Sequence, residues 1–343
     1  MEKIIGGLSN DVFKYNNLIL KFYKHSNLNL NYEFEEFVQK KLYEKYHNVP
    51  KIYQSIIIDN KLVGRIEKYI ESTNVTKEDF TSNICIYANL LKKIHNINIT
   101  DINITEFDIN IIDFDINITD FDINIIDFDI KNLPNFFTCL NNWTKILDND
   151  NNDTHTYIFD DYRLIKEKAE EYISGLLMFL QHIGCKQVLC HNDFQQLNVL
   201  VDKENNYYVI DFEYASINYP YFDIANYFSE CAFDNKAIKY DSSLYPNTEK
   251  RYQFYKEYFI DSPNILLFQE YDFIVLQFAP LVEYYWYIWS LLKYIQTKSI
   301  DYITYANIRK INFNNLINKY VKVNKVKLST SNFAFCSTVI CNK

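Results

Sequence analysis

Two stretches decide the fold of this chain, VLCHNDFQQLNVLV at residues 188–201 and YYVIDFEYA at residues 207–215. In each, a short apolar run predicts a strand, and polar residues bracket the strand ends. The polar residues Asp193, Asn198 and Asp211 offer the hard oxygen atoms that Mg²⁺ prefers. An Asp that orients an attacking hydroxyl, an Asn five residues later and an Asp after the next strand suit phosphoryl transfer. The pattern therefore predicts a phosphotransferase site.

Two simpler interpretations compete with this one. A hairpin with polar residues on its turn would carry similar residues, but apolar strands bracket both polar clusters. A zinc site is disfavoured, because one His with a nearby Cys does not complete a tetrahedral ligand set. We expect His191 to brace the loop by hydrogen bonds rather than to act as a base.

The first 72 residues predict a small, mostly β lobe. IIGGLSNDVFKY and NLILKFYK read as strands that pair across a turn, as do IYQSIIID and LVGRIEKYI. Between these pairs, a helix is expected from about 31 to 46, with Phe34, Val38 and Leu42 on one buried face. The N-terminal lobe thus combines an antiparallel sheet with one helix.

Helical patterns dominate from residue 73 to residue 320, so we expect a larger and mainly helical C-terminal lobe. Helices are expected at about 79–95, 161–182, 219–233, 249–260 and 268–298, and short strands at about 187–190, 198–202 and 207–212. The predicted fold class is α+β. Residues 321–343 form a tail with no assigned role.

A seven-residue repeat, DINITEF, DINIIDF, DINITDF, DINIIDF, lies at the start of the segment 101–130. Ile, Asn and Asp in every unit argue against a coiled coil. One interpretation is an acidic partner-binding insert. A tolerated low-complexity expansion in a surface loop is favoured over it.

Charge and composition limit the class of partner. Nine of the 44 acidic residues lie in 101–130, and the other 35 match the 35 Lys and Arg. Without a Lys/Arg stripe there is no electrostatic footprint for nucleic acid, so small-molecule partners are favoured. The longest apolar stretch, 273–292, contains Gln277, Pro280 and Glu283 and is interpreted as a buried helix rather than a membrane span.

Cysteine usage and the N-terminus predict a cytoplasmic protein. The seven cysteines are scattered and show no CxxC spacing, which is typical of reduced thiols. The opening MEKIIGGLSN lacks a basic region followed by an apolar run of signal-peptide length.

CHNDFQQLNVLV and IDFEYASINYPYFDIANYFSE resemble the signature block of the choline/ethanolamine kinases, which are relatives of the aminoglycoside phosphotransferases. GGLSN, LILKFY, VPKIY, GRIEKYI and WYIWS occur around it in the family's order. The resemblance covers most of the chain except the repeat and the tail. It implies a bilobal protein-kinase-like fold, ATP and Mg²⁺ as cofactors, and phosphorylation of choline or ethanolamine as an entry step of phospholipid head-group synthesis.

The resemblance also implies roles for residues of the catalytic segments. Asp193 is expected to be the base that contacts the acceptor, with Gln195 beside the phosphates and His191 bracing the loop. Asn198 and Asp211 are expected to bind Mg²⁺. The residues implied at ATP are Gly7, Ser9 and Asn10 of the Gly-rich turn, the Lys21 side chain, and the backbone of Lys68 and Ile70.

An acid on the helix after Lys21 is expected to pair with that lysine. Counting back from VPKIY favours Glu36, whereas Glu33 and Glu35 are close enough to remain open.

Aromatic residues near the C-terminus suit a cationic head group. An ammonium ion gains about 0.5–2 kcal/mol per aromatic face when desolvated. A core aromatic stripe would show the same helical spacing, but the family uses WxxWS and a nearby Tyr as its amine box. The residues implied at the acceptor are Glu230, Trp286, Trp289, Tyr302 and Tyr305.

Two features leave the acceptor open. Many choline kinases place a Tyr five residues after the acid that corresponds to Glu230, whereas this chain has Asn235. The following AIKYDSSLYP is more like the shorter version of the ethanolamine kinases. Gln195, by contrast, is common in choline kinases.

The alternatives are an aminoglycoside-type phosphotransferase, which WYIWS disfavours, and a non-catalytic binding module, which the intact catalytic set disfavours. The chain starts almost at its first strand, without the extension that many relatives use in dimer contacts, so a homodimer stays open.

Overall fold

The computed structural model describes residues 2–4, 10–24, 28, 30–59, 61–98, 135–149, 156–260 and 268–327. Gly7, Ser9, the 101–130 repeat and the end of the chain after residue 327 lie outside these ranges, and the predictions for them stay predictions. The contacts divide the chain into two compact units. Unit 1 contains Met1–Asp79, Lys92–Asn141 and Val188–Asn218, and unit 2 contains Phe80–Leu91, Asn142–Gln187 and Tyr219–Lys343. The division differs from a lobe boundary at residue 72, because the catalytic segments group with the N-terminal sheet.

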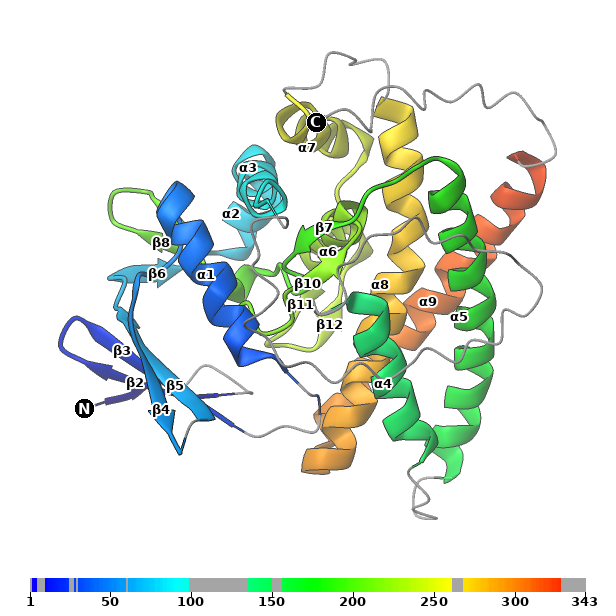
Figure 1. Ribbon diagram of the computed structural model, residues 1–343. Coiled ribbons are helices and arrows are strands. Elements are labelled where there is room, and N and C mark those ends of the chain that lie inside the picture. The colour runs from blue at the N-terminus through cyan, green and yellow to red at the C-terminus, as the bar shows by residue number, and fades with distance from the viewer. Residues whose placement is uncertain are drawn as a thin grey trace. The chain divides into compact units, whose positions relative to one another are not determined.

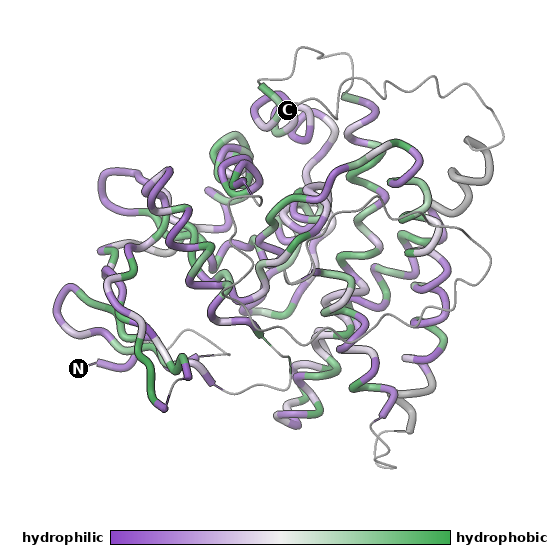
Figure 2. Tube along the Cα trace, in the orientation of Figure 1, coloured by the Kyte–Doolittle hydropathy of each residue, from purple (hydrophilic) through white to green (hydrophobic). Residues whose placement is uncertain are grey.

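Unit 1 contains an antiparallel sheet in the strand order β1-β2-β3-β5-β4 (Figure 1). The strands are β1 Glu2–Ile4, β2 Asn10–Tyr15, β3 Leu18–Tyr23, β4 Ile52–Ile58 and β5 Lys61–Lys68. Asn16, in the turn between β2 and β3, has φ 52°, a backbone conformation that Asn tolerates better than most residues. The end of β4 is hydrophobic (green in Figure 2), although it lies at the sheet edge.

Among the described residues of the N-terminal 72, one helix is present, α1 Tyr32–Tyr46, as expected. It begins at Asn31, whose side chain accepts a hydrogen bond from the Phe34 N–H at 2.8 Å and so caps the first turn. Phe34, Val38 and Leu42 are buried, which confirms the face expected from their spacing.

The two signature stretches are residues 188–201 and 207–215. Together with residues 216–218, they form short antiparallel strand pairs in unit 1. β7 Val188–Cys190 pairs with β10 Ser216–Asn218, and β8 Val199–Asp202 pairs with β9 Tyr207–Val209. β6 Ser72–Asn74 joins the free side of β8. β7, β8 and β9 agree with the expected strands, whereas β6 and β10 were not expected from the sequence. The polar residues of interest lie just beyond the ends of β7 and β9.

Helices make up most of the remaining described chain. They are α2 Lys77–Ser82, α3 Ile84–His95, α4 Phe136–Asp148, α5 Thr156–His182, α6 Pro220–Ala232, α7 Thr248–Tyr258, α8 Phe268–Thr297 and α9 Ile300–Lys327, with the short strands β11 Phe233–Asp234 and β12 Lys239–Tyr240. The segment 79–95 contains two helices rather than one, and neither α4 nor α9 was expected from the sequence. α9 also continues past residue 320, the expected end of the C-terminal lobe.

In unit 2, the long α8 packs along α9 and against α6 (Figure 1). Most of α8 is buried from Tyr271 to Lys293, including the charged Glu283, which confirms a buried helix. Within the described ranges, no helix is both long enough and apolar enough to cross a bilayer.

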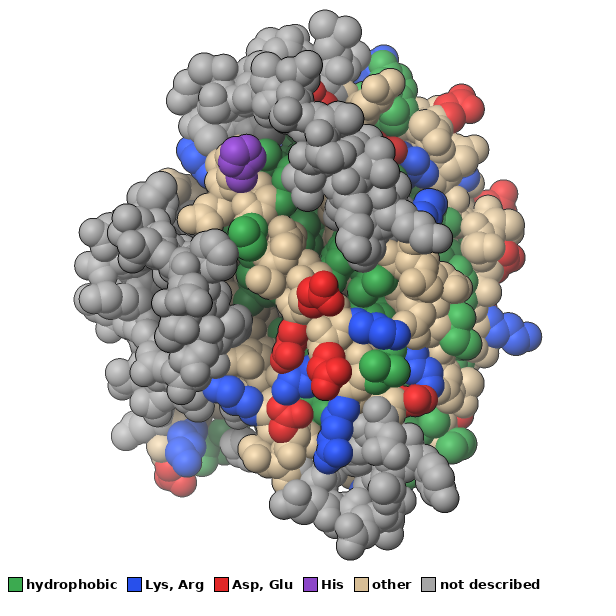
Figure 3. All heavy atoms as spheres, turned by 90° about the vertical axis from the view of Figure 1, so that its right-hand side faces the viewer, with side chains coloured by type: hydrophobic (Ala, Val, Ile, Leu, Met, Phe, Trp, Pro, Cys, Tyr) green, Lys and Arg blue, Asp and Glu red, His purple; other side chains and the backbone are tan. Residues whose placement is uncertain are grey.

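Acidic and basic side chains are intermixed on the face drawn in Figure 3. Ion pairs of unit 2 include Lys310 with Asp161 and Lys166 with Asp148. This mixing agrees with the balanced charge of the sequence outside the repeat.

Candidate active site

The carboxylate of Asp193 is held by two neighbouring amides. Gln195 Nε2 donates to Asp193 Oδ1 at 3.0 Å and to Oδ2 at 3.2 Å, and Asn198 Nδ2 donates to Oδ2 at 2.8 Å. The 3₁₀ turn Gln196–Asn198 folds the chain back so that Asn198 also reaches the Asp193 carbonyl, at 2.9 Å. Gln195 and Asn198, two of the expected site residues, are thus brought together around a third, the buried Asp193.

His191 ties this loop to the next signature stretch. Its Nε2 lies 3.1 Å from the Ile210 carbonyl oxygen, and the Asp193 N–H donates to its Nδ1 at 3.3 Å. These contacts require a neutral imidazole with the proton on Nε2, because Nδ1 acts as an acceptor. Such a ring braces the loop and has no lone pair left for proton abstraction.

Asn192 is a site residue that sequence reasoning missed. Its φ is 61°, in the left-handed region that Asn tolerates. The buried side chain donates to the Tyr214 carbonyl at 2.9 Å and to Ser216 Oγ at 2.8 Å. These bonds hold the sharp turn that sets Asp193 in place, and the only signal in the sequence is an Asn between two expected site residues.

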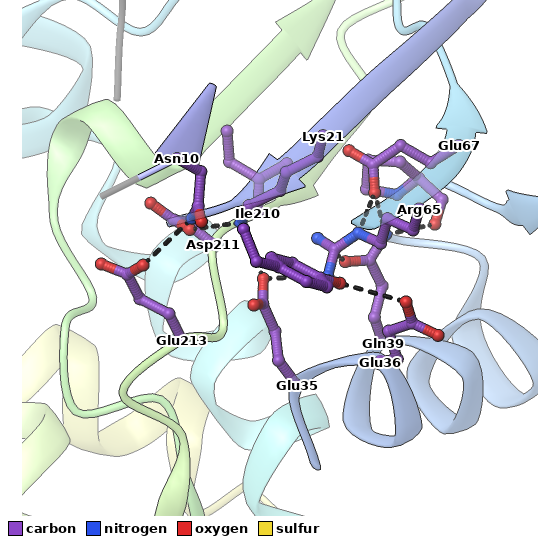
Figure 4. Close-up of polar contacts among 12 residues, drawn as sticks. Asn10, Lys21, Glu35, Glu36, Gln39, Arg65, Glu67, Ile210, Asp211 and Glu213 are labelled. Carbon is purple, nitrogen blue, oxygen red and sulfur yellow. Dashed lines mark hydrogen bonds and ion pairs between the residues drawn. The ribbon is translucent and has the colours of Figure 1, made fainter. Parts of the chain in front are cut away.

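Lys21 on β3 joins α1 to the second signature stretch (Figure 4). Its Nζ lies 2.8 Å from Glu35 Oε1 and 2.8 Å from Asp211 Oδ1. Burial alone would lower the pKa of Lys21, but Asp211 and Glu35 outweigh it and raise the pKa above its ordinary value. The ammonium group is therefore charged, as the expected contact with the ATP phosphates would require.

The acid that pairs with Lys21 is Glu35, so the preference for Glu36 was wrong. Glu36 instead accepts from Ser55 Oγ, from the Tyr23 hydroxyl at 3.1 Å and from Lys40 Nζ at 3.2 Å. Successive helix residues point about 100° apart. Counting along the sequence from a landmark cannot resolve a shift of one residue, whereas the helix geometry can.

Asp211 has φ 67°, an uncommon backbone conformation for an Asp. Burial raises the pKa of its carboxyl group. The positive charges of Lys21 and then Arg65 lower this pKa by more, so that it lies below the ordinary 3.8. The Ile210 N–H donates to the Asn198 carbonyl at 3.0 Å, which joins the segments that carry the two expected metal ligands.

Arg65 is a second buried cation that sequence reasoning missed (Figure 4). Its guanidinium group contacts Glu35 at 3.0 Å, Glu67 at 2.8 Å and Gln39 at 2.9 Å. It therefore holds the same carboxylate that Lys21 contacts.

Glu213, another acid missed from the sequence, lies beside Asn10 (Figure 4). Asn10 Nδ2 donates to Glu213 Oε2 at 3.2 Å, and both side chains are buried. Within the described ranges, Asn10 Oδ1 has no hydrogen-bond partner. Asn10 is therefore part of this cluster, and its amide oxygen is available to a ligand.

Lys68 and Ile70 lie at the end of β5 and just after it. The Lys68 N–H already donates to the Lys51 carbonyl at 2.8 Å. A contact from Lys68 to adenine would therefore use its carbonyl oxygen. The adenine contacts remain predictions.

Unit 2 brings together the aromatic residues expected at the acceptor. Ring centres lie 5.5 Å apart for Trp286 and Trp289, 5.6 Å for Trp289 and Tyr302, and 6.0 Å for Trp289 and Tyr305. Trp286 Nε1 donates to Asn226 Oδ1 at 2.8 Å, which fixes its ring. Residues from α8 and α9 thus form one aromatic cluster.

Charged residues accompany this cluster in a way the sequence did not indicate. Glu230 Oε1 accepts from Arg309, and Glu230 Oε2 accepts from Asn235 Nδ2 at 2.9 Å. Lys293 Nζ lies 5.6 Å from the centre of the Trp289 ring. Glu230 therefore has a cation of the protein as its partner and is not an isolated counter-charge.

The sequence and the fold were then compared with those of known proteins. The family model for choline/ethanolamine kinase matches residues 1–314. The chain belongs to the choline/ethanolamine kinase family. A probable ethanolamine kinase of Arabidopsis thaliana is 33% identical over 132 residues, covering 37% of this chain and 34% of the relative. The matched segment spans 33% to 41% of the length of the curated relatives described as ethanolamine or choline kinases.

Solved structures of the family share the fold. An ethanolamine kinase of Plasmodium vivax superposes with a TM-score of 0.72 at 21% identity, covering 93% of this chain and 83% of the other. A choline kinase of Cryptosporidium parvum gives a TM-score of 0.68 at 20% identity, covering 96% and 92%. The bilobal, protein-kinase-like α+β fold expected from the sequence is confirmed.

Proposed function

We propose that this choline/ethanolamine kinase family member transfers the γ-phosphoryl group of Mg-ATP to the hydroxyl of ethanolamine or choline. The observation that carries the proposal is the buried Asp193 carboxylate, oriented by Gln195 and Asn198. A carboxylate held in this way can orient the acceptor hydroxyl and accept its proton as the phosphoryl group moves. Neutral His191 has no role in that proton transfer beyond fixing the loop.

Lys21 supports the ATP part of the proposal. Its ammonium group is fixed by Glu35 and Asp211 at 2.8 Å each, so little rearrangement is needed to meet a phosphate. Asn10, buried and with an amide oxygen that has no partner among the described residues, is the first residue of β2 and follows Ser9 in the sequence. Gly7 and Ser9 of that turn are proposed to contact the phosphates through backbone N–H groups.

The residues present fit Mg²⁺. Asn198 and Asp211 provide amide and carboxylate oxygens on segments joined by a main-chain hydrogen bond, and the pKa of Asp211 is lowered, so it is ionised at neutral pH. A bound Mg²⁺ would neutralise the negative charge that develops on the phosphoryl oxygens. Glu213, buried and two residues after Asp211, is a further acid that acts on Lys21 and raises its pKa.

The aromatic cluster of unit 2 supports an amino-alcohol as acceptor. Trp286, Trp289, Tyr302 and Tyr305 present ring faces and edges to one another, and such rings bind ammonium groups. An aminoglycoside would require an acidic groove in place of these rings. The proposal assigns the chain to phospholipid head-group synthesis in the cytoplasm.

The test is ADP release by the purified chain with Mg-ATP and either ethanolamine or choline, with Asp193→Asn as the control. We expect turnover with at least one amine, and a kcat roughly 10²- to 10⁴-fold lower in the variant because the proton acceptor is lost. ATP binding without turnover of any acceptor would favour a non-catalytic module. Turnover of an aminoglycoside but of neither amine would favour the other acceptor class.

A further inference from the structure

Arg309 is a completely buried guanidinium group on α9. Its Nη1 donates to Ser229 Oγ at 3.1 Å and to both oxygens of Glu283 at 3.4 Å. Its Nη2 donates to Glu230 and to the Tyr305 hydroxyl at 2.6 Å. The forked guanidinium thus links α6, α8 and α9, the helices that carry the expected acceptor residues.

Two aromatic rings enclose the same guanidinium. Its central carbon lies 4.2 Å from the centre of the Phe233 ring and 4.8 Å from that of Tyr305. A planar cation between two rings gains cation–π attraction and has little room to rotate. Arg309 is therefore a fixed point of unit 2.

Two residues expected to bind the acceptor have polar atoms that contact Arg309. One carboxylate oxygen of Glu230 accepts a hydrogen bond from Arg309, and the other accepts one from Asn235. The Tyr305 hydroxyl oxygen also accepts a hydrogen bond from Arg309. The Tyr305 ring in turn lies 6.0 Å from Trp289. The orientation of this part of the aromatic cluster thus depends on the guanidinium.

Charge complements this geometry. Arg309 contacts two buried carboxylates, Glu230 and Glu283, and one guanidinium cannot neutralise both. The other cation beside these aromatic residues in the described chain is Lys293, over the Trp289 ring. An acceptor with a single ammonium group fits this arrangement, because Arg309 already supplies part of the positive charge that the two carboxylates require.

We propose that Arg309 is a positioning residue that sets the affinity for the ammonium group of the acceptor. It acts through Glu230 and Tyr305 and does not touch the acceptor. This inference rests on the proposed function, because it concerns the acceptor site of the same reaction.

The test compares the Michaelis constants for the amine and for ATP in Arg309→Gln and Arg309→Lys. We expect Arg309→Gln to raise KM for the preferred amine at least 10-fold while KM for ATP changes less than 2-fold. Arg309→Lys should recover only part of the loss, because an ammonium group lacks the fork that reaches two carboxylates and a hydroxyl. Lys310→Gln, at the neighbouring and half-buried position that pairs with Asp161, is the matched control and should leave both constants unchanged.

A second pair of variants guards against misfolding. Arg309→Gln leaves two buried carboxylates without their cation, so the double variant Arg309→Gln/Glu283→Gln restores the charge balance and should fold while keeping the raised amine KM. Tyr305→Phe removes only the hydroxyl contact and should raise the amine KM by about 2- to 10-fold.

The outcomes separate the two proposals. If the wild-type chain phosphorylates an amine, but the folded Arg309 variants keep the wild-type amine KM or raise both constants together, the positioning role is overturned and the proposed function stands. If the wild-type chain phosphorylates neither amine, both proposals fall.

Discussion

Arg65 lies directly opposite Lys21 on the paired antiparallel strands β5 and β3, and both cations contact the carboxylate of Glu35. Like charges opposite each other in a sheet are destabilising. Here Glu35, completely buried, offsets the repulsion, with distances of 2.8 Å to Lys21 and 3.0 Å to Arg65. The position of Lys21, the lysine proposed to bind phosphate, therefore depends on Glu35 and on the second cation that shares this acid, Arg65. Among the described ion pairs, Lys21 contacts Asp211 and Arg65 does not.

This arrangement predicts different effects for adjacent acids of α1. Glu35→Gln should lower kcat/KM for ATP by roughly 10- to 100-fold, because Lys21 and Arg65 lose their shared anion. Glu36→Gln should lower it less than about 3-fold, since Glu36 contacts Ser55, Lys40 and Tyr23 instead. Steady-state kinetics of both purified variants checks the prediction. A larger loss in Glu36→Gln would return the pairing role to that residue.

The lowered pKa of Asp211 predicts a pH-dependent contribution to stability. The folded-state pKa is below the ordinary 3.8, so the ionised carboxylate stabilises the fold above about pH 4, and this contribution is lost as the pH falls through the folded value. The difference in free energy of unfolding between wild type and Asp211→Asn should therefore shrink from pH 7 towards pH 3 in urea titrations.

Lys21→Met is the control for this prediction, because Lys21 is the main cause of the depression. Without the ammonium group, burial raises the pKa of Asp211, and the loss of stability should begin at a higher pH. An unchanged pH profile in Lys21→Met would show that Lys21 does not govern this titration.

Gly64 on β5 predicts a backbone constraint on Lys21. A Cβ at Gly64 would lie 2.5 Å from the Lys21 carbonyl oxygen, so Gly64→Ala forces β3 and β5 apart and should cost about 1–3 kcal/mol in free energy of unfolding. Gly175 in α5 is the matched control, because nothing lies within 4 Å of its added Cβ. Gly175→Ala should stabilise the helix by about 0.5–1 kcal/mol. Equal effects of the two substitutions in urea unfolding would contradict the constraint.

The aromatic cluster predicts a loss of acceptor affinity without a loss of ATP affinity. Trp289→Ala removes the ring that contacts Trp286, Tyr302 and Tyr305, and should weaken amine binding by about 0.5–2 kcal/mol. The ratio of the amine KM to the ATP KM in the variant and the wild type measures this. Trp289→Phe keeps a ring and should retain most of the affinity; a KM for ATP that rises in step would point to general misfolding.

Much of the catalytic loop was predictable, because its residues are close in sequence. Asp193, Gln195 and Asn198 lie within six positions, and a short turn brings their side chains together whatever surrounds them. The strands on either side followed from their apolar runs. The resemblance to the family added the positions of Lys21 and of the aromatic residues.

The sequence by itself determined most of the helices and strands, the short loop that joins Asp193, Gln195 and Asn198, and the family of this protein. The tertiary structure decided which acid meets Lys21, that Arg65 shares that acid, and that Glu230 and Tyr305 are held by Arg309. Helices and strands follow from neighbouring residues and from the spacing of apolar side chains, and both can be read directly from the order of residues in the sequence. The partner of a buried charge, by contrast, depends on rotations of about 100° per helix residue and on the packing of distant strands, and only the folded chain brings these together.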